Sequence, residues 1–382
     1  MKTHLSSMNQ EISYKICTKC IMDTSDPDIT FDKNGICSHC KIYESTIMSK
    51  DYLKRREPGA LDRLVNEIKE KGKGKRFDCI IGVSGGVDST YTAYITNKLK
   101  LRTLAVHLDN GWDSELAVSN IEKTLKRLGI DLYTYVIDWD EFRDLQLAFL
   151  KSSTPDSEIP TDHAIHAILY KTAVEEDVEF ILIGRNTATE CGGVPAWSQG
   201  HGDWRYIKGI SKQFGLKKLK SFPHYGPMEL LYFAFKGIKN IPILDYTDYD
   251  KKTALQILKN ELCWKDYGAK HFESIYTRFY QGFILPKKFR FNKKRLHLSS
   301  LVWSGQITRE KALEEMEVDD YPLGLQEEDR EYVIKKLGIS PEEFEKIMSE
   351  HPKSFWDYPS YKSMPIFHSK QVLAFYHRLK RI

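Results

Sequence analysis

A short glycine-rich run lies between an apolar segment and a helix-forming segment. Its residues are Ser84, Gly85, Gly86, Val87, Asp88 and Ser89. Two consecutive glycines allow a tight turn and a close approach of a ligand to the backbone, and the N–H groups that open the following helix favour a phosphate. The serines add hydroxyl donors, and Asp88 is an oxygen ligand for a Mg²⁺ that bridges phosphates. The run predicts nucleotide binding without a Walker motif; a strand-to-helix turn with no ligand is the alternative.

Four of the seven cysteines form two pairs with the spacing of metal knuckles. They are Cys17, Cys20, Cys37 and Cys40. Two C-x2-C pairs predict a zinc ribbon with all-thiolate tetrahedral ligation. Because four thiolates leave no open position, the Zn²⁺ is expected to be structural. A reducing compartment keeps such thiolates available for metal, and His39, between the pairs, is not needed as a ligand.

The composition is that of a globular protein with a substantial core. The chain has 382 residues, a formal net charge of +4 and 41% hydrophobic residues, and this length favours two or three domains. The basic excess is too small to imply a nucleic-acid or anionic-membrane partner. No apolar run reaches the ~20 residues of a spanning helix, and the N-terminus lacks the apolar stretch of a secretory signal. We therefore expect a cytoplasmic protein with no membrane partner.

Alternating strand and helix patterns must position these residues. Apolar runs predict strands at 77–83, 102–108, 131–138, 178–184 and 241–246. Segments with helical spacing separate them, and one is expected to have Thr161 as its N-cap behind Pro160. This alternation predicts an α/β fold with a doubly wound parallel sheet. Helical spacing dominates the last part of the chain, with a restart at Ser340.

Four parts follow from this pattern. They are a zinc ribbon at 14–45, a helical linker at 46–76, a nucleotide-binding α/β domain at 77–268 and a helical substrate or partner region at 269–382. Ligands of open α/β sheets bind at the carboxyl ends of the strands. The glycine-rich run follows the first strand directly, so it is expected to lie in that crevice.

The run SGGVDS resembles the PP-loop of the ATP pyrophosphatases, the superfamily of GMP synthetase, NAD synthetase and the tRNA-thiolating enzymes. The resemblance implies that ATP is cleaved between its α and β phosphates, that a substrate oxygen is adenylated, and that AMP leaves when a nucleophile attacks. It further implies that Asp109 and Asn110, after the second strand, contact adenosine. Gly184, Asn186 and Glu190, after the fourth strand, are expected to close over pyrophosphate and metal.

Longer stretches resemble the N-acetyl sugar amidotransferase family. They are the cysteine-rich N-terminus, IPTDHAIHA (159–167), GRNTATE (184–190), WKDYGAKHFES (264–274), TRFYQG (277–282) and HLSSLVWSGQITREKAL (297–313). These enzymes of surface-polysaccharide and flagellin-glycan pathways turn a sugar acetamido group into an acetamidino group. The resemblance implies a nucleotide-activated or nonulosonic N-acetyl sugar as substrate, with ATP, Mg²⁺ and structural Zn²⁺ as cofactors.

Several side chains suit this chemistry. Adenylation gives an inert amide an AMP leaving group, which ammonia displaces, and the charge on the leaving pyrophosphate must be held by loop amides, Mg²⁺ and cations. The expected catalytic residues are Asp88, Glu190, Lys270 and Arg278. The expected substrate contacts are His163, His166, His271 and Glu273. Solvated charges, and histidines whose hydrogen bonds serve only the fold, are the alternatives.

Partners and competing functions follow from what the sequence lacks. No glutaminase triad or nucleophile elbow is present, so ammonia is expected from a separate glutaminase complex, which by resemblance is a pair like the two subunits of imidazole glycerol phosphate synthase. The basic run 286–295 suits a nucleic-acid patch, a docking face for a nucleotide-activated or carboxylated sugar, or a solvated loop, and the small net charge weakens the first interpretation.

The main alternative function is a tRNA-thiolating enzyme, because several of these combine a zinc ribbon with a PP-loop. They usually carry a second cysteine array or a catalytic cysteine pair, whereas Cys79, Cys191 and Cys263 have no C-x2-C partner. A regulatory module that binds nucleotide without turnover is a third interpretation.

Overall fold

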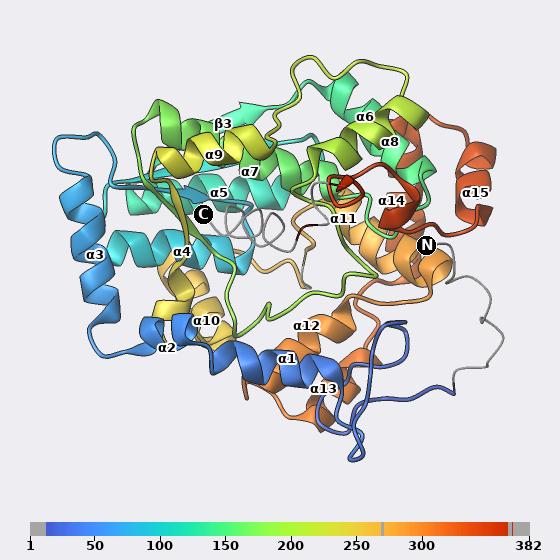
Figure 1. Cartoon of the computed structure of the whole chain (residues 1–382), viewed down its shortest axis with the longest axis horizontal. Helices are drawn as coiled ribbons and strands as arrows, with labels where there is room; N and C mark the ends of the chain where they lie inside the picture. Colours follow the sequence, from blue (N-terminus) through green and yellow to red (C-terminus); the bar gives the residue numbers. More distant parts are fainter. Residues whose placement is uncertain (1–12, 269–270, 366–368, 370–382) are drawn as a thin grey trace.

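The computed structural model describes residues 13–268, 271–365 and 369, and its course is shown in Figure 1. Five parallel strands form one sheet in the order β3-β2-β1-β4-β5. Their bounds are β1 Cys79–Gly82, β2 Thr103–Asp109, β3 Asp131–Val136, β4 Phe180–Ile183 and β5 Lys239–Pro242. The chain grows outward from β1 first in one direction and then in the other. This order is that of a doubly wound α/β sheet and confirms the predicted fold class.

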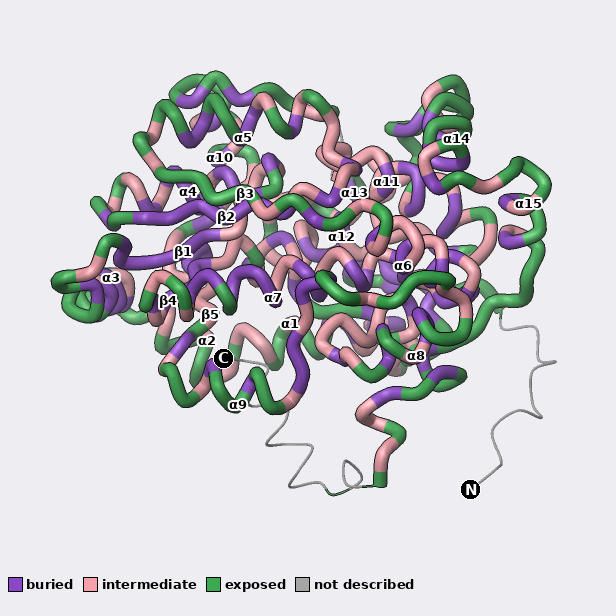
Figure 2. The backbone as a smooth tube through the Cα atoms, turned by 90° about the horizontal axis from the view of Figure 1, so that it is seen from above, coloured by how far each residue is buried: buried purple, intermediate pink, exposed green. Residues whose placement is uncertain are grey.

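The inner strands β1, β2 and β4 are largely apolar on both faces because helices cover each face, whereas β3, at one edge of the sheet, is mostly exposed. Alternate residues of β1 point to opposite sides: Ile80 belongs to the core with α6 (Trp139–Lys151) and α7 (Ile159–Glu175). Cys79 and Ile81 belong to the other core, with α3 (Ala60–Lys71), α4 (Val87–Lys98) and α5 (Glu115–Leu128). In Figure 2 the buried strands lie between α4 and α5 on one side and α7 on the other.

Element bounds differ from the sequence expectation at two places near the sheet. The fifth strand starts at Lys239, and the residues expected to continue it form the 3-10 turn η1, Ile243–Tyr246. The predicted N-cap Thr161 is wrong, because Glu158 takes the cap position and Pro160 sits in the first turn, where its missing N–H is not needed. The Thr161 hydroxyl instead accepts a hydrogen bond from Asn110 Nδ2 at 3.3 Å.

Helices make up most of the rest of the described chain. They are α1 Ser38–Ile47, α2 Lys50–Arg56, α8 Trp204–Phe214, α9 Pro227–Phe235, α10 Lys251–Leu262, α11 Ile275–Phe279, the wide helix η2 Tyr280–Phe289, α12 Lys294–Trp303, α13 Arg309–Met316, α14 Leu323–Leu337, α15 Pro341–Ser349 and the 3-10 turn η3 Phe355–Asp357. The predicted helical C-terminal region is confirmed. Ser340 caps α15 by accepting from the Glu343 N–H at 3.1 Å, as its sequence position predicts.

The cysteine-rich N-terminal residues pack against helices that lie far along the chain. We call residues 14–45 the cysteine segment; its helix α1 lies near α12 and α13 in Figure 1. One hydrophobic core contains Cys17 of this segment, Ile80 of the sheet and Phe344 of α15. The boundaries of the four predicted parts stay a prediction. Among the residues that the structure describes, no helix has both the length and the apolar character needed to cross a membrane.

Candidate active site

The glycine-rich turn leads from β1 into α4. Gly85 has a φ of +80°, and a Cβ atom there would lie 2.8 Å from Tyr267 Oη, so this position requires glycine. Gly86 is the N-cap of α4. The hydroxyl oxygens of Ser84 and Ser89 lie 3.3 Å apart beside it. Helix-start N–H groups and two hydroxyls therefore face one point, which suits a phosphate group.

Two aromatic side chains hold this turn from behind. Trp264 Nε1 and Tyr267 Oη each donate a hydrogen bond of 2.9 Å to the Gly85 carbonyl oxygen. Their rings meet edge to face with centroids 5.5 Å apart, and Trp264 is buried. Both lone pairs of the Gly85 oxygen are thereby used. The shape of the turn depends on a motif far along the chain.

We expect Tyr267→Phe to raise the dissociation constant of a non-hydrolysable ATP analogue about ten-fold, since it removes one of the two hydrogen bonds that fix Gly85 and keeps the ring. Isothermal titration calorimetry measures this. Tyr94→Phe is the matched control, because it removes a buried hydroxyl of α4 that donates to Glu261 and not to the turn. Equal affinities for wild type and Tyr267→Phe would show that Trp264 alone holds the turn.

A cavity of about 350 Å³, the loop-side cavity, opens on the turn. Its walls include Gly86, Val87, Asp88, Arg185, Glu190 and Lys251. Tyr249 Oη donates to Asp88; burial raises the pKa of Tyr249, and the Asp88 charge raises it further, so the phenol stays a donor. The cavity is also lined by Asp266 and Glu273. The two cations and the helix-start N–H groups suit a phosphate chain. The carboxylate oxygens are the donor type that fits Mg²⁺.

A second cavity of about 470 Å³, the sheet-side cavity, lies at the carboxyl ends of β1, β2 and β4. It shares with the loop-side cavity the residues Ser84, Ser89, Gly184, His271 and Glu273. Part of its wall is apolar, formed by Val106, Leu108, Ile165, Leu169 and Ile183. The two cavities therefore meet at the glycine-rich turn. One ligand could therefore place a flat apolar ring in the sheet-side cavity and a phosphate chain in the loop-side cavity.

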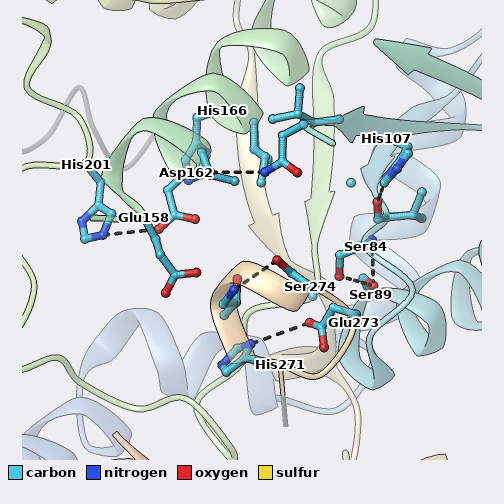
Figure 3. Close-up of a pocket in the computed structure, with 18 of the residues that line it drawn as sticks. Ser84, Ser89, His107, Glu158, Asp162, His166, His201, His271, Glu273 and Ser274 are labelled. Atoms are coloured by element: carbon cyan, nitrogen blue, oxygen red, sulfur yellow. Dashed lines mark hydrogen bonds and ion pairs between the residues drawn. The ribbon is translucent and has the colours of Figure 1, made fainter. Parts of the chain in front are cut away.

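The far part of the sheet-side cavity is polar, and we call it the polar end. Its charged residues are Asp156, Glu158, Asp162, His201 and Lys293. Figure 3 shows Glu158, Asp162 and His201 on one side of the cavity, opposite His107 and the turn. None of these five residues was singled out from the sequence. The acidic ones are scattered over 156–162 with no motif, and Lys293 is one of many basic residues in its run.

Charges in the polar end are paired. Lys293 Nζ lies 3.6 Å from Asp156 Oδ2, and His201 Nε2 lies 3.5 Å from the same oxygen and 3.3 Å from Asp162 Oδ2. Burial would lower the pKa of Lys293, but the three carboxylates raise it above its usual value. Burial likewise opposes the charge of His201, and Asp156 and Asp162 raise its pKa nonetheless. The neighbouring carboxylates therefore favour the charged forms of both side chains in a partly desolvated place.

His107 is a second site residue that sequence reasoning missed. Its Nδ1 donates to the Val83 carbonyl oxygen at 2.9 Å, and its Nε2 lies 3.2 Å from Asp113 Oδ2. Since both partners are acceptors, they favour the doubly protonated ring. Burial would lower the pKa of His107, but the hydrogen bond to Asp113 raises it. A histidine inside the apolar run of β2, followed by an aspartate six residues on, is the signal that could have identified it.

The predicted adenosine and pyrophosphate contacts lie in and behind these walls. Asn110 lines the sheet-side cavity and Gly184 lines both cavities. Asp109 and Asn186 do not line either of them. Asp109 Oδ1 accepts from the Gly111 N–H at 2.9 Å, and Asn186 Oδ1 accepts from the Thr189 N–H at 2.9 Å. These two side chains shape their own turns, which differs from the expected direct contact with ATP.

The predicted substrate-binding histidines separate into two groups. His163 is fully buried, stacks on Tyr225 with centroids 4.4 Å apart and donates from Nδ1 to the His201 carbonyl oxygen at 2.7 Å. Its place is in the core, so the expected substrate contact does not fit. His166 and His271 line the sheet-side cavity with Glu273. Burial, helped by the positive charge nearby, lowers the pKa of His166 to about 4, so this ring is neutral.

The predicted catalytic cations are also placed differently from expectation. Arg278 pairs with Asp329 through Nε and Nη2, each at 2.7 Å, and Tyr321 Oη donates to the same carboxylate. This pairing holds Arg278 outside both cavities, so a phosphate contact does not fit. Lys270 lies outside the described residues. The cations that the structure places at the loop-side cavity are Arg185 and Lys251; Arg185, next to Gly184, could have been found from its motif.

The four cysteines form a site that fits a zinc ion. Their sulfur atoms lie within 4.8 Å of one another, all four are buried, and no other group of this kind occurs among the described residues. Sγ–Sγ distances of 3.6 and 3.7 Å match the ~3.8 Å edge of a tetrahedron with Zn–S bonds near 2.3 Å. N–H groups of Lys19, Cys20 and Cys37 donate to Cys17 Sγ. His39 pairs with Asp26 at 2.6 Å and is not a ligand.

The parallel sheet and the glycine-rich turn are of the PP-loop, NAD synthase-like type, and two family models match parts of the chain. Residues 60–188 match the family model described as NAD synthase. Residues 273–372 match the model described as LPS biosynthesis protein WbpG-like, C-terminal domain. The pair of matches confirms the resemblance to PP-loop sugar-modifying enzymes and supports an ATP-dependent, ligase-type role.

Curated relatives match parts of the chain. A GMP synthase (glutamine-hydrolyzing) of Pyrobaculum aerophilum is 33% identical over 110 residues, which is 26% of this chain and 21% of the relative. A tRNA-specific 2-thiouridylase, MnmA, of Mesomycoplasma hyopneumoniae is 29% identical over 168 residues, which is 36% of this chain and 44% of the relative. The chain thus spans less than half the length of these relatives.

Solved structures show only a distant likeness. The NMN synthetase from Francisella tularensis is 17% identical with a TM-score of 0.30, covering 75% of this chain and 89% of that chain. The U34-tRNA thiolase NcsA from Methanococcus maripaludis is 18% identical with a TM-score of 0.32, covering 81% and 91%. Scores this low add nothing to what the sheet itself shows.

Proposed function

We propose that the chain is an ATP-dependent amidotransferase that adenylates the acetamido oxygen of an activated N-acetyl sugar and replaces this oxygen with ammonia. The products are an acetamidino sugar, AMP and pyrophosphate. One observation carries the proposal: two cavities meet at the glycine-rich turn, one suited to a phosphate chain and the other, of about 470 Å³, with an apolar wall and a polar end. The match of residues 273–372 to a model from lipopolysaccharide biosynthesis supports a sugar as the acceptor.

In this proposal each reacting group has a place in one of the two cavities. The β and γ phosphates lie in the loop-side cavity against the α4 N–H groups, Lys251 and Arg185, and the adenine lies against the apolar wall. The α phosphate is then at the shared boundary with Ser84 and Ser89, and the acetamido oxygen approaches it from the sheet-side cavity. Entry opposite the leaving pyrophosphate is the geometry of an in-line displacement.

Mg²⁺ would be held by Asp88 and Glu190 together with phosphate oxygens, and it would neutralise charge on the leaving pyrophosphate. The protein's own part is to hold that charge with fixed dipoles and cations in a partly desolvated cavity. The adenylated imidate carbon is then open to ammonia. We propose that the ammonia comes from a separate glutaminase complex, like the paired subunits of imidazole glycerol phosphate synthase.

tRNA thiolation is the second candidate, favoured by the match to a 2-thiouridylase. Sulfur transfer on this plan needs a reactive cysteine at the adenylated base. Within the described residues, no cysteine lines either cavity. Cys79 is buried in β1 against Thr103, and burial raises its pKa to about 12, which makes it a poor nucleophile. Cys263 is exposed at the end of α10.

We expect the purified protein, given ATP, Mg²⁺, ammonium chloride and a nucleoside-diphosphate diacetamido uronic acid or a nonulosonic acid, to release AMP and pyrophosphate. The sugar product should be lighter by the mass difference between O and NH in mass spectrometry. AMP formation should require the sugar. ADP with orthophosphate as products, or thiolated tRNA from a sulfur donor, would overturn the proposal.

A further inference from the structure

Helix α12 joins the cysteine segment to the sheet-side cavity. Three of its residues, spaced four apart, face the cysteine segment: Arg295, Ser299 and Trp303. Arg295 Nε lies 3.0 Å from Asp23 Oδ2 and its Nη1 donates to the Ile21 carbonyl oxygen at 2.7 Å. Ser299 Oγ accepts from the Ile21 N–H at 3.3 Å, and Trp303 Nε1 donates to Cys40 Sγ at 3.2 Å. One face of the helix is therefore clamped.

The opposite face of the same helix reaches the polar end. Lys293 is the residue before α12 and has helical dihedral angles, φ −61° and ψ −23°. Two residues along a helix turn by about 200°, so Lys293 points away from Arg295. His297, one turn after Lys293, lines the same cavity. The clamp on Arg295 thus fixes where Lys293 and His297 enter the polar end.

The polar end contains both hydrogen-bond donors and hydrogen-bond acceptors. Lys293, His201 and the amide of Gln281 are donors, and Asp156, Glu158 and Asp162 are acceptors. Gln281 Nε2 already donates to Glu158 Oε2 at 2.9 Å. Alternating donors and acceptors with nearly balanced charge suit the hydroxyl and amide groups of a sugar ring. A free carboxylate or phosphate would need an unpaired cation here.

We propose that the polar end is the subsite for the hydroxyl- and amide-bearing ring of the acceptor, and that the cysteine segment positions Lys293 and His297 in it through α12. This inference rests on the proposed function. Lys293 is a binding residue of the subsite. Arg295 touches no substrate and acts as a positioning residue. The cysteine segment then affects acceptor binding and leaves the ATP site, on the far side of the turn, unchanged.

The test measures two constants for each variant: the acceptor KM in the AMP-release assay, and the dissociation constant of a non-hydrolysable ATP analogue by calorimetry. We expect Lys293→Met and Arg295→Met each to raise the acceptor KM about 10- to 100-fold, because each removes a charged hydrogen bond. The dissociation constant of the ATP analogue should stay within about two-fold of the wild-type value. Arg295→Lys, which keeps a donor for Asp23, should recover part of the loss. Lys287→Met is the matched control, because Lys287 belongs to the same basic run and lies over the Phe283 ring, outside the cavities.

Distinct outcomes separate the two proposals. If the wild type converts an N-acetyl sugar but Lys293→Met leaves its KM unchanged, the subsite is wrong and the function stands. If Arg295→Met weakens binding of the ATP analogue as much as binding of the acceptor, the contacts of Arg295 with Asp23 and Ile21 only stabilise the fold, and the positioning role is wrong. If the wild type releases no AMP with any N-acetyl sugar, the proposed function fails, and the subsite with it.

Discussion

Asp88→Asn should reduce AMP formation by about 10³-fold or more while the protein stays folded. Asp88 is in the first turn of α4 and lines the loop-side cavity beside the phosphate-binding N–H groups. Its carboxylate is the best-placed oxygen ligand for a divalent ion there, and asparagine keeps the shape but loses the charge that such an ion and the leaving pyrophosphate need. The measurement is the rate of AMP release at saturating ATP and sugar.

Asp140→Asn is the matched control for this substitution. Asp140 takes the same position in α6 that Asp88 takes in α4, the second residue of the helix, but it is exposed and pairs with Lys217 at 2.7 Å. An exposed pair of this kind contributes about 0–1 kcal/mol, so the control should keep wild-type turnover and melting temperature. Wild-type turnover in Asp88→Asn would remove this carboxylate from the reaction.

The second large effect is expected at the metal site. Cys17→Ala should abolish stoichiometric zinc and lower the melting temperature by roughly 10 °C, since metal binding supplies several kcal/mol to a segment with little core of its own. The loss should extend beyond the cysteine segment, because Arg309 of α13 donates to the carbonyl oxygens of Cys17 and Cys20. Metal analysis and thermal unfolding measure both effects.

Cys263→Ala is the control, because this cysteine is exposed and lies outside the cluster. Its zinc content should equal that of the wild type. A folded Cys17→Ala protein with one equivalent of zinc would contradict ligation by four thiolates. A variant that loses zinc but unfolds at the wild-type temperature would show that packing against α12 and α13 is enough for the segment.

The sequence was sufficient to predict the features that local chemistry determines. The turn from Gly85 to Asp88 needs glycine at a positive φ and a helix start, and both requirements are visible in six residues. The cysteine spacing likewise places four sulfur atoms around one point. The inner strands followed from apolar runs that separate helical segments, because a strand covered on both faces has no polar side.

Residues that depend on distant partners could not be assigned in this way. Arg278 lies in a family-like stretch and Lys293 in the basic run 286–295, yet Asp329 binds the first away from the cavities, and α12 directs the second into one. His163 and His166 are three residues apart on α7, yet His163 is buried against Tyr225 and His166 lines the sheet-side cavity. These outcomes come from tertiary contacts that no local pattern contains.

The Gly85 carbonyl has a consequence for how the protein is made. Its two hydrogen-bond donors, Trp264 and Tyr267, follow it by 179 and 182 residues. At ~5–20 residues per second, a ribosome needs about 10 to 40 seconds to synthesise that stretch. The nascent loop cannot adopt its finished shape before then, so a fragment ending earlier than Trp264 should bind nucleotide poorly even where its sheet has formed.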